Sequence, residues 1–172
     1  MSKYAKLVDG EVVGTVDTDG DMPAPWLLIP DSFSWAARPS AQHKPMYAAG
    51  VVSWTDARTL AQARAAHITA MRDARDAQIN GTFTWDGSQF DADQVSQTRL
   101  LGAVVAASSS NFEPVTWRLA DNTWRELSAA NVAAVYTALQ LHVRSHFVTF
   151  AAREAAINAA TTVSAVDAVT WE

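Results

Sequence analysis

The sequence has 172 residues, of which 49% are apolar and 18% charged, so the chain can build a folded core and is not of the disordered class. Its formal charge of −5 argues against a basic nucleic-acid-binding surface, and the absence of cysteine excludes disulfides, thiolate metal sites and cysteine catalysis. No apolar run approaches the roughly 20 residues that a bilayer-spanning helix needs, and the first residues lack the apolar core of a secretory signal. We therefore expect a globular protein that is not secreted and binds neither nucleic acid nor membrane.

The composition changes near residue 55. Five of the six prolines precede this point, whereas 26 of the 33 alanines and nine of the ten arginines follow it. Alanine favours helices and proline breaks them, so the change predicts two parts. We expect a β-rich part over residues 1–55 and a helix-rich part over residues 56–172, which together make an α+β protein.

Residues 1–55 are predicted to begin with a small β-hairpin unit. Two β-prone runs, 4–8 and 11–16, flank Asp9-Gly10, a pair that favours a type I′ turn. An extended Pro-rich segment follows over residues 22–44, where the prolines exclude a long helix or a central strand. Residues 47–54 are expected to form one further strand. The extended segment carries many large apolar side chains, so we expect it to lie on the helical part or on another chain.

Residues 56–172 predict the order helix–hairpin–helix–hairpin–long helix. The helices are expected at 56–78, 93–108 and 128–160, and the hairpins at 84–90 and 116–124. We expect the two hairpins to form or extend one small antiparallel sheet, with Trp85, Trp117 and Trp124 as core anchors. Ser164 is the predicted N-cap of a final short turn, and Trp171 is available to hold the end of the chain.

The long helix carries a stripe with strict 4-3 spacing, which favours packing against another helix within the chain or in another copy. The first half of the stripe is predicted to belong to the core. The second half, with Phe147 and Phe150 beside Arg153, is predicted to be a contact surface, because phenylalanine and arginine are typical of interfaces. The stripe consists of Val132, Tyr136, Leu139, Val143, His146, Phe150, Arg153 and Ile157.

No motif predicts catalytic chemistry. His142 and His146 lie one turn apart, but a zinc-protease motif needs Glu where this chain has Val143, so ordinary helix histidines are favoured. The acidic run 17–21 lacks the spacing of a calcium loop and is interpreted as a solvated turn. Serines 108–110 lack a nucleophile elbow, and Asp91 and Asp93 fit helix capping. We predict no metal, no cofactor and no enzymatic activity.

Aromatic residues that are hard to bury are the predicted partner-binding residues. Seven tryptophans are many for this length, and three of them lie in the small N-terminal part. Tryptophan is a common interface anchor, so we expect a protein–protein contact there, with sugar stacking as the alternative. The predicted partner-binding residues are Trp26, Phe33, Trp35, Trp54, Phe147 and Phe150.

The second part also resembles a known family. Residues 56–172 are similar to a domain of unknown function that recurs at the C-terminus of small bacteriophage proteins encoded among tail and tail-fibre genes. The resemblance rests on the Arg-rich helix from Ala63 to Arg75, on Phe83-Thr84-Trp85-Asp86-Gly87 with Phe90-Asp91-Ala92-Asp93, on Val115-Thr116-Trp117, on Glu126-Leu127-Ser128, and on the closing run from Glu154 to Ala160. The start, Lys6-Leu7-Val8-Asp9-Gly10-Glu11-Val12-Val13, is loosely similar to many small tail proteins.

This resemblance implies a non-enzymatic role in a phage tail. The expected function is that of a virion structural protein of the distal tail, in the baseplate or at the fibre attachment, assembled in the host cytoplasm. The expected partners are other tail or tail-fibre proteins and a second copy of the chain. The alternative is a tail-fibre assembly chaperone that is not retained in the virion. A host-glycan hydrolase is a third hypothesis, disfavoured because no acid/base pair emerges from the sequence.

Overall fold

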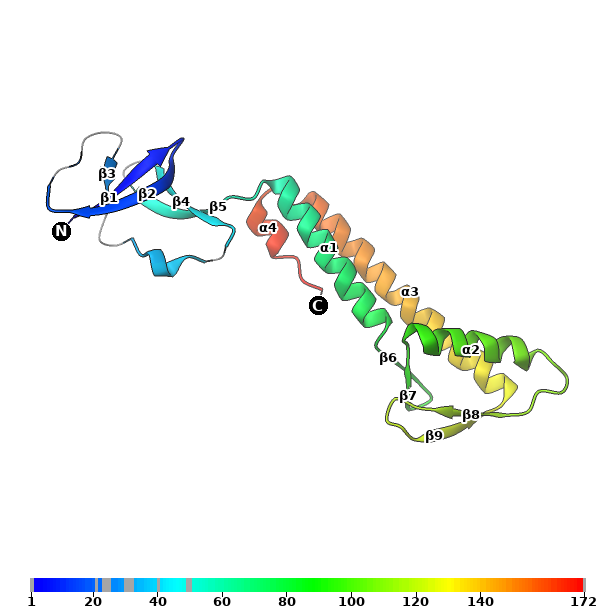
Figure 1. Cartoon of the computed structure of the whole chain (residues 1–172). Coiled ribbons are helices and arrows are strands. Elements are labelled where there is room, and N and C mark those ends of the chain that lie inside the picture. The colour runs from blue at the N-terminus through cyan, green and yellow to red at the C-terminus, as the bar shows by residue number, and fades with distance from the viewer. Residues whose placement is uncertain are drawn as a thin grey trace. The chain divides into compact units, whose positions relative to one another are not determined.

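A computed structural model describes residues 2–20, 22, 26–29, 33–39, 41–48 and 51–171 of the protein (Figure 1). The chain divides into two compact units, Met1–Ala61 (unit 1) and Gln62–Glu172 (unit 2). The division falls six residues after the boundary that composition predicts. Strands and a short 3₁₀ helix, η1 (Trp35–Ala37), make up the regular structure described in unit 1. Helices dominate unit 2, so the predicted α+β class is confirmed.

Unit 1 contains a five-stranded antiparallel sheet among its described residues, in the order β3-β1-β2-β4-β5. Its strands are β1 (Ser2–Val8), β2 (Glu11–Thr18), β3 (Trp26–Leu28), β4 (His43–Ala48) and β5 (Val51–Asp56). The predicted first hairpin is confirmed, because Asp9 and Gly10 adopt φ values of 50° and 80° between β1 and β2.

The later part of unit 1 differs from the prediction. Where one strand is predicted over residues 47–54, residues 43–48 and 51–56 form two paired strands. Pro45 lies inside β4, which has strands on both sides, yet β4 pairs with β2 only at Glu11–Met46. A proline is tolerated there because that ladder is nearly absent. The predictions of a Pro-rich segment and of an acidic turn rest partly on residues outside the described ranges. These residues are Asp21, Pro23, Pro25 and Pro30.

Unit 2 follows the predicted order. Helix α1 (Leu60–Ile79) leads into β6 (Thr82–Trp85) and β7 (Ser88–Asp91), then α2 (Gln94–Ala107), β8 (Val115–Arg118), β9 (Trp124–Leu127), α3 (Ala129–Ala159) and α4 (Val163–Asp167). Asp93 caps α2 as predicted, and Ser128, where the long helix is predicted to start, caps α3. The last helix begins two residues early, because the Thr162 hydroxyl, and not Ser164, accepts a hydrogen bond from the Ala165 amide.

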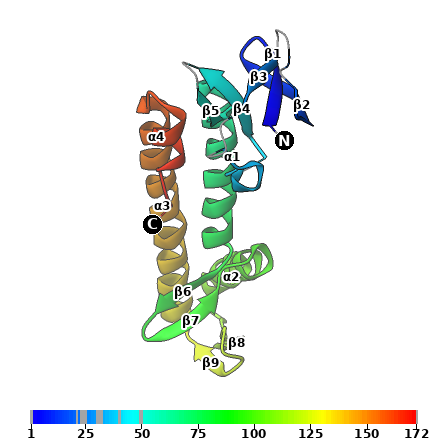
Figure 2. The same ribbon diagram turned by 90° about the vertical axis from the view of Figure 1, so that its left-hand side faces the viewer.

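Helices α1 and α3 run side by side in opposite directions, and the segment after α4 folds back beside them (Figures 1 and 2). Polar contacts hold these pieces together. The Arg64 guanidinium donates to the Ala160 carbonyl over 2.6 Å, and the His67 ring lies 2.7 Å from the Val169 carbonyl. Arg153 donates to the carbonyl of Trp171, whose ring stacks on His146. The expectation that Trp171 holds the end of the chain is confirmed.

The core of unit 2 lies between α2, the start of α3 and the two hairpins. The prediction that the two hairpins form one sheet is wrong, because they form two separate two-stranded sheets. They are joined by a single ladder-like hydrogen bond from the Ala120 amide to the Gln89 carbonyl, and by Arg125. The Arg125 side chain stacks on Trp85, binds the Asp86 carboxylate and donates to the Ser88 hydroxyl.

Every residue of the 4-3 stripe on α3 is buried or partly buried. The first half joins the core of unit 2, as predicted, with Val132 and Leu139 fully buried. The second half is also covered, since α1 and the C-terminal segment lie over it. Phe150 is only 8% exposed, so the prediction that its ring lies on a contact surface is wrong. Four-three spacing shows that a helix packs but does not say what covers it.

Candidate functional site

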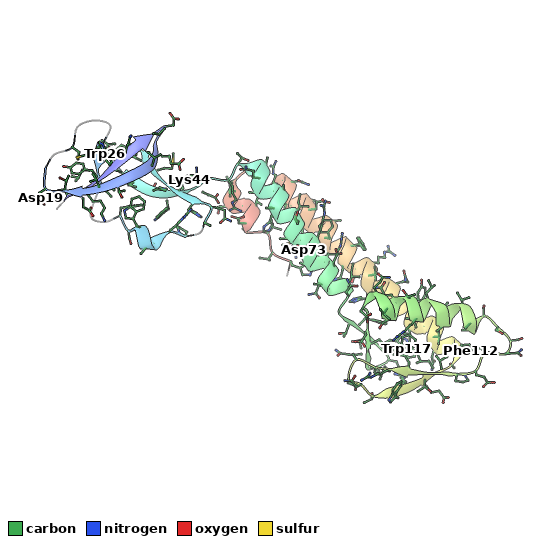
Figure 3. The ribbon with its side chains drawn as sticks, in the orientation of Figure 1. Asp19, Trp26, Lys44, Asp73, Phe112 and Trp117 are labelled. Atoms are coloured by element: carbon green, nitrogen blue, oxygen red, sulfur yellow. The ribbon has the colours of Figure 1, made fainter. Side chains whose placement is uncertain are left out.

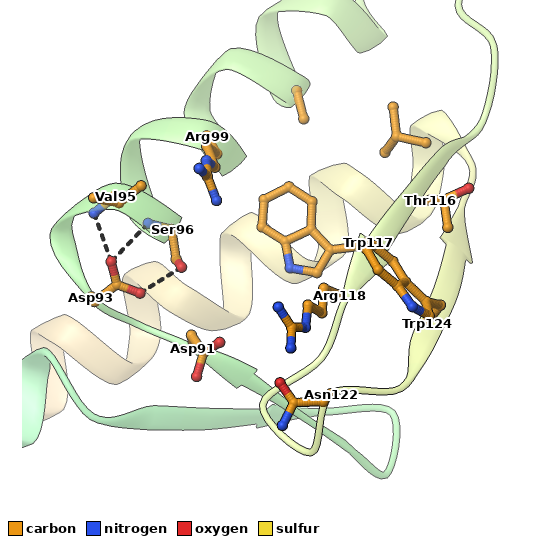
Figure 4. A pocket seen from close by; sticks show the side chains of 12 residues that line it. Asp91, Asp93, Val95, Ser96, Arg99, Thr116, Trp117, Arg118, Asn122 and Trp124 are labelled. Carbon is orange, nitrogen blue, oxygen red and sulfur yellow. Dashed lines mark hydrogen bonds between the residues drawn. The ribbon is translucent and has the colours of Figure 1, made fainter.

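Unit 2 contains a groove with a volume of about 610 Å³ between α2, the end of β7 and the β8–β9 hairpin (Figure 4). Asp91 and Asp93 line it where β7 leads into α2, and Ser96 and Arg99 line it from α2. The hairpin side of the groove consists of Val115, Thr116, Trp117, Arg118, Asn122 and Trp124. The volume lies within the range of pockets that bind small molecules.

All four residues of β8 line this groove. Successive side chains of a strand point to opposite faces, so one face of β8 would contribute only alternate residues. The whole strand therefore borders the groove by its edge. Strand β8 pairs with β9 on its other side and has no further strand partner among the described residues. The groove thus has a free strand edge as one wall and the first turns of α2 as the opposite wall.

The charged groups of the groove differ in their pairing. Asp93 is fully engaged, because its carboxylate accepts hydrogen bonds from the Val95 and Ser96 amides and from the Ser96 hydroxyl, at 2.8, 3.2 and 2.6 Å. These bonds, with those from Ser96 foremost, lower the pKa of Asp93 below its ordinary value. Arg99, Arg118 and Asp91, in contrast, have no hydrogen bond or ion pair from their side chains within the described ranges.

Two tryptophans shape the hairpin side of the groove. The Trp117 ring points into the groove, and in Figure 4 it lies between Arg99 and Arg118. It also packs on the core of unit 2, as does Trp85, so the core prediction holds in part for both. Trp124 is 66% exposed, and the prediction that it anchors the core is wrong. Leu127 at the end of β9 points inward, so two-residue alternation turns Trp124 outward.

Three of the predicted partner-binding residues form an aromatic cluster in unit 1. The rings of Phe33, Trp35 and Trp54 have centroids 5.0 to 5.9 Å apart, and Arg38 lies 5.8 Å from the centre of the Trp54 ring. The Trp54 indole N–H donates to the Ser34 carbonyl over 3.2 Å. All three rings are partly exposed. Phe33 and Trp35 also pack on the small buried core of this unit, which consists of Ala5, Val12, Ile29 and Val52.

The other three predicted partner-binding residues are not part of this cluster. Trp26, labelled in Figure 3, lies on β3, an outer strand of the unit 1 sheet. Its ring does not contact the rings of Phe33, Trp35 and Trp54. Phe147 and Phe150 belong to α3 in unit 2, where the Arg75 guanidinium lies 4.7 and 4.9 Å from their ring centres. Phe147 is 48% exposed and remains a candidate contact residue, whereas Phe150 is buried.

His142 and His146 of α3 both make contacts with neighbouring groups. The His142 ring nitrogen Nε2 lies 3.0 Å from the Gln78 carbonyl, and the His142 and His146 rings meet at 82°. Burial, followed by the nearby His142, lowers the pKa of His146 below its ordinary value. Within the described ranges no three histidine or acidic side chains converge as a metal site would require. No helix in that part of the chain is long and apolar enough to cross a membrane.

The groove lies in a region that matches a known family. The family described as a domain of unknown function (DUF4376) matches residues 62–170, which is nearly all of unit 2. No curated protein and no solved structure matches the chain.

Sequence reasoning missed Arg99, Arg118 and Trp124 as groove residues. Arg99 lies at an exposed position of α2, and an arginine there is typical of any solvated helix face. The exposure of Trp124 follows from alternation once Leu127 is taken as buried, and this signal was present in the sequence. The groove itself depends on how α2 lies over the second hairpin, and no local pattern reports that arrangement.

Proposed function

We propose that this chain, which belongs to the DUF4376 family because the match covers more than half of its length, is a structural protein of a bacteriophage distal tail. In this proposal it is a non-enzymatic component of the baseplate or of the fibre attachment, and it acts through protein–protein contacts. The sequence resemblance of residues 56–172 to a domain of small tail-gene products supports the tail location.

The observation that carries the binding role is the aromatic cluster of unit 1. Phe33, Trp35 and Trp54 meet with Arg38 on a unit whose core cluster contains four buried residues within the described part of the chain. Tryptophan and arginine are the residue types that dominate binding energy at protein interfaces. Partly exposed rings that already contact one another lose little conformational freedom when a partner covers them. The cluster therefore suits the attachment of unit 1 to a neighbouring subunit.

Mass spectrometry of particles purified from the phage that encodes this chain tests the tail assignment. We expect the chain in a fixed ratio to the known tail subunits. If it is absent from particles but bound to fibre protein in the infected-cell lysate, it is an assembly chaperone instead. If it is found with neither, the tail proposal is wrong.

Point variants test the role of the cluster in the full-length chain. We expect Trp35→Ala combined with Trp54→Ala to abolish incorporation into particles, because two of the three rings of the cluster are removed. Val13→Ala is the matched control, since Val13 is an exposed apolar residue of the same unit. Amide NMR spectra of the purified variants establish that unit 1 stays folded. Normal incorporation of a folded double variant would show that the cluster is not the attachment surface.

A further inference from the structure

We propose that the groove of unit 2 binds an extended acidic segment of a partner protein, which adds as a strand to the free edge of β8. This site is separate from the aromatic cluster of unit 1 and does not depend on the tail assignment. The proposal rests on three features of the groove: its strand edge, its unpaired arginines and its tryptophans.

The strand edge supplies the backbone recognition. All of Val115 to Arg118 borders the groove, and this side of β8 has no strand partner among the described residues. An edge strand presents a row of amide and carbonyl groups that an extended peptide can pair with, as in the β-augmentation mode of peptide binding. Four residues of strand extend about 13 Å, so the complementary segment needs at least four residues.

The unpaired charges determine which peptide fits. Arg99 approaches from α2 and Arg118 from β8, and neither guanidinium has a carboxylate partner among the described residues. The Asp93 carboxylate is occupied by the α2 N-terminus, which leaves Asp91 as the one unpaired carboxylate in the lining. The groove therefore has two unpaired cations and one unpaired anion. A glutamate or aspartate of the bound segment placed beside either guanidinium completes charge-assisted hydrogen bonds.

The tryptophans supply the apolar part of the site. Trp117 points into the groove, and Trp124 lines it with most of its surface exposed. Side chains of an added strand alternate between its two faces. A segment in which β-branched or aromatic residues alternate with acidic ones therefore places apolar side chains on the indoles and carboxylates at the arginines. A saccharide could stack on the indoles, but it has no row of amides to pair with β8, so we favour the peptide.

A displayed library of random 12-residue peptides, selected against the full-length protein, tests this inference. We expect the enriched sequences to alternate acidic residues with β-branched or aromatic ones. The selected peptides should protect the β8 amides from hydrogen exchange. Their affinity should fall when NaCl is raised from 50 to 500 mM, because partly exposed ion pairs are screened by salt.

Charge reversal on both sides of the complex locates the contact. We expect Arg118→Glu to weaken the selected peptides about tenfold or more, the loss that follows from removing a charge-assisted hydrogen bond and adding a repulsion. Arg144→Glu is the matched control, since Arg144 is exposed on α3 and does not line the groove. Replacing the acidic residue of the peptide by its amide should give a similar loss with the unaltered protein, which avoids any dependence on how a variant folds.

The proposal is overturned by any of four results. The library yields no peptide whose binding responds to Arg118→Glu, the enriched peptides are neutral or basic, the protected amides lie outside β8, or only an anionic oligosaccharide such as oligogalacturonate binds. The last result would identify a glycan site in the same groove.

Discussion

Phe150 and Phe147 allow a direct test of what covers α3. Both belong to the same helix and both lie under the guanidinium of Arg75, yet Phe150 is 8% exposed and Phe147 is 48% exposed. Replacing each by alanine removes the same atoms and the same kind of contact with Arg75. The two variants therefore differ in burial and little else.

The expected difference follows from burial. Full burial of a phenylalanine side chain contributes about 1.5–3 kcal/mol, so the transfer loss is nearly complete at Phe150 and about half of that at Phe147. Only the buried site leaves a cavity, which brings the cost of Phe150→Ala to about 3–5 kcal/mol. The higher helix propensity of alanine returns about 0.5 kcal/mol in both variants and cancels in the comparison. We expect Phe147→Ala to lower the free energy of unfolding by about 1 kcal/mol.

Thermal unfolding followed by circular dichroism at 222 nm measures this difference. The signal reports mainly on unit 2, because α1 to α4 lie in it or begin at its boundary. For a chain of this size each kcal/mol shifts Tm by about 2–4 °C, so the Phe150→Ala variant should melt at least about 4 °C below the Phe147→Ala variant. Equal Tm values, or a lower Tm for Phe147→Ala, would show that α1 and the C-terminal segment do not cover the second half of the stripe.

Three further predictions concern the same unit. We expect Phe147→Asp to keep the circular dichroism of the parent protein and to weaken self-association in sedimentation velocity, whereas Leu139→Asp should abolish the helical signal because Leu139 is 1% exposed. Asp93→Ala should lower the free energy of unfolding by about 1 kcal/mol at pH 7, because the cap is lost. The difference between parent and variant should begin to shrink as pH falls below 3.8, where the unfolded carboxyl protonates, and should disappear only once the folded carboxyl, of lower pKa, also protonates; urea titrations over this pH range measure it. The pKa of His146 is lowered in the folded chain, so the unfolded chain binds a proton at this histidine more readily. The free energy of unfolding should therefore fall as pH drops below the ordinary pKa of 6.5. His146→Gln should flatten the curve of Tm against pH in that range.

Local signals were sufficient for most of the elements. Asp-Gly turns located two hairpins, where Asp9, Gly10, Asp86 and Gly87 all have positive φ. The caps Asp93 and Ser128 set the starts of two helices within one residue. These predictions succeed because a turn or a cap is determined by a few adjacent residues. The last helix shows the limit, since serine is the better N-cap by propensity, yet Thr162 and not Ser164 caps it.

Predictions that needed a distant partner were less accurate. The 4-3 spacing correctly predicts a packing face on α3. The prediction that Phe150 in its second half lies on a contact surface is wrong, because α1 and the C-terminal segment cover it. His67 reaches Val169 and Arg64 reaches Ala160, contacts that join residues about 100 positions apart. The sequence predicts Phe33, Trp35 and Trp54 as partner-binding aromatic residues but does not predict that their rings contact one another. These contacts depend on the position of Trp54 on β5 beside residues 33–35.

The candidate groove depends on the separation of the two hairpins, which the sequence analysis does not predict. In a single merged sheet, as the sequence analysis predicts, a neighbouring strand would be able to pair with the edge of β8. Instead the Ala120 amide binds the Gln89 carbonyl just beyond the end of β8, and Arg125 fixes β9 to the turn of the first hairpin through Asp86 and Ser88. These contacts attach the second hairpin by its β9 side and its turn, and they leave β8 facing α2 across the groove. An edge kept open in this way, with two unpaired arginines beside it, is the arrangement from which strand addition by an acidic partner follows.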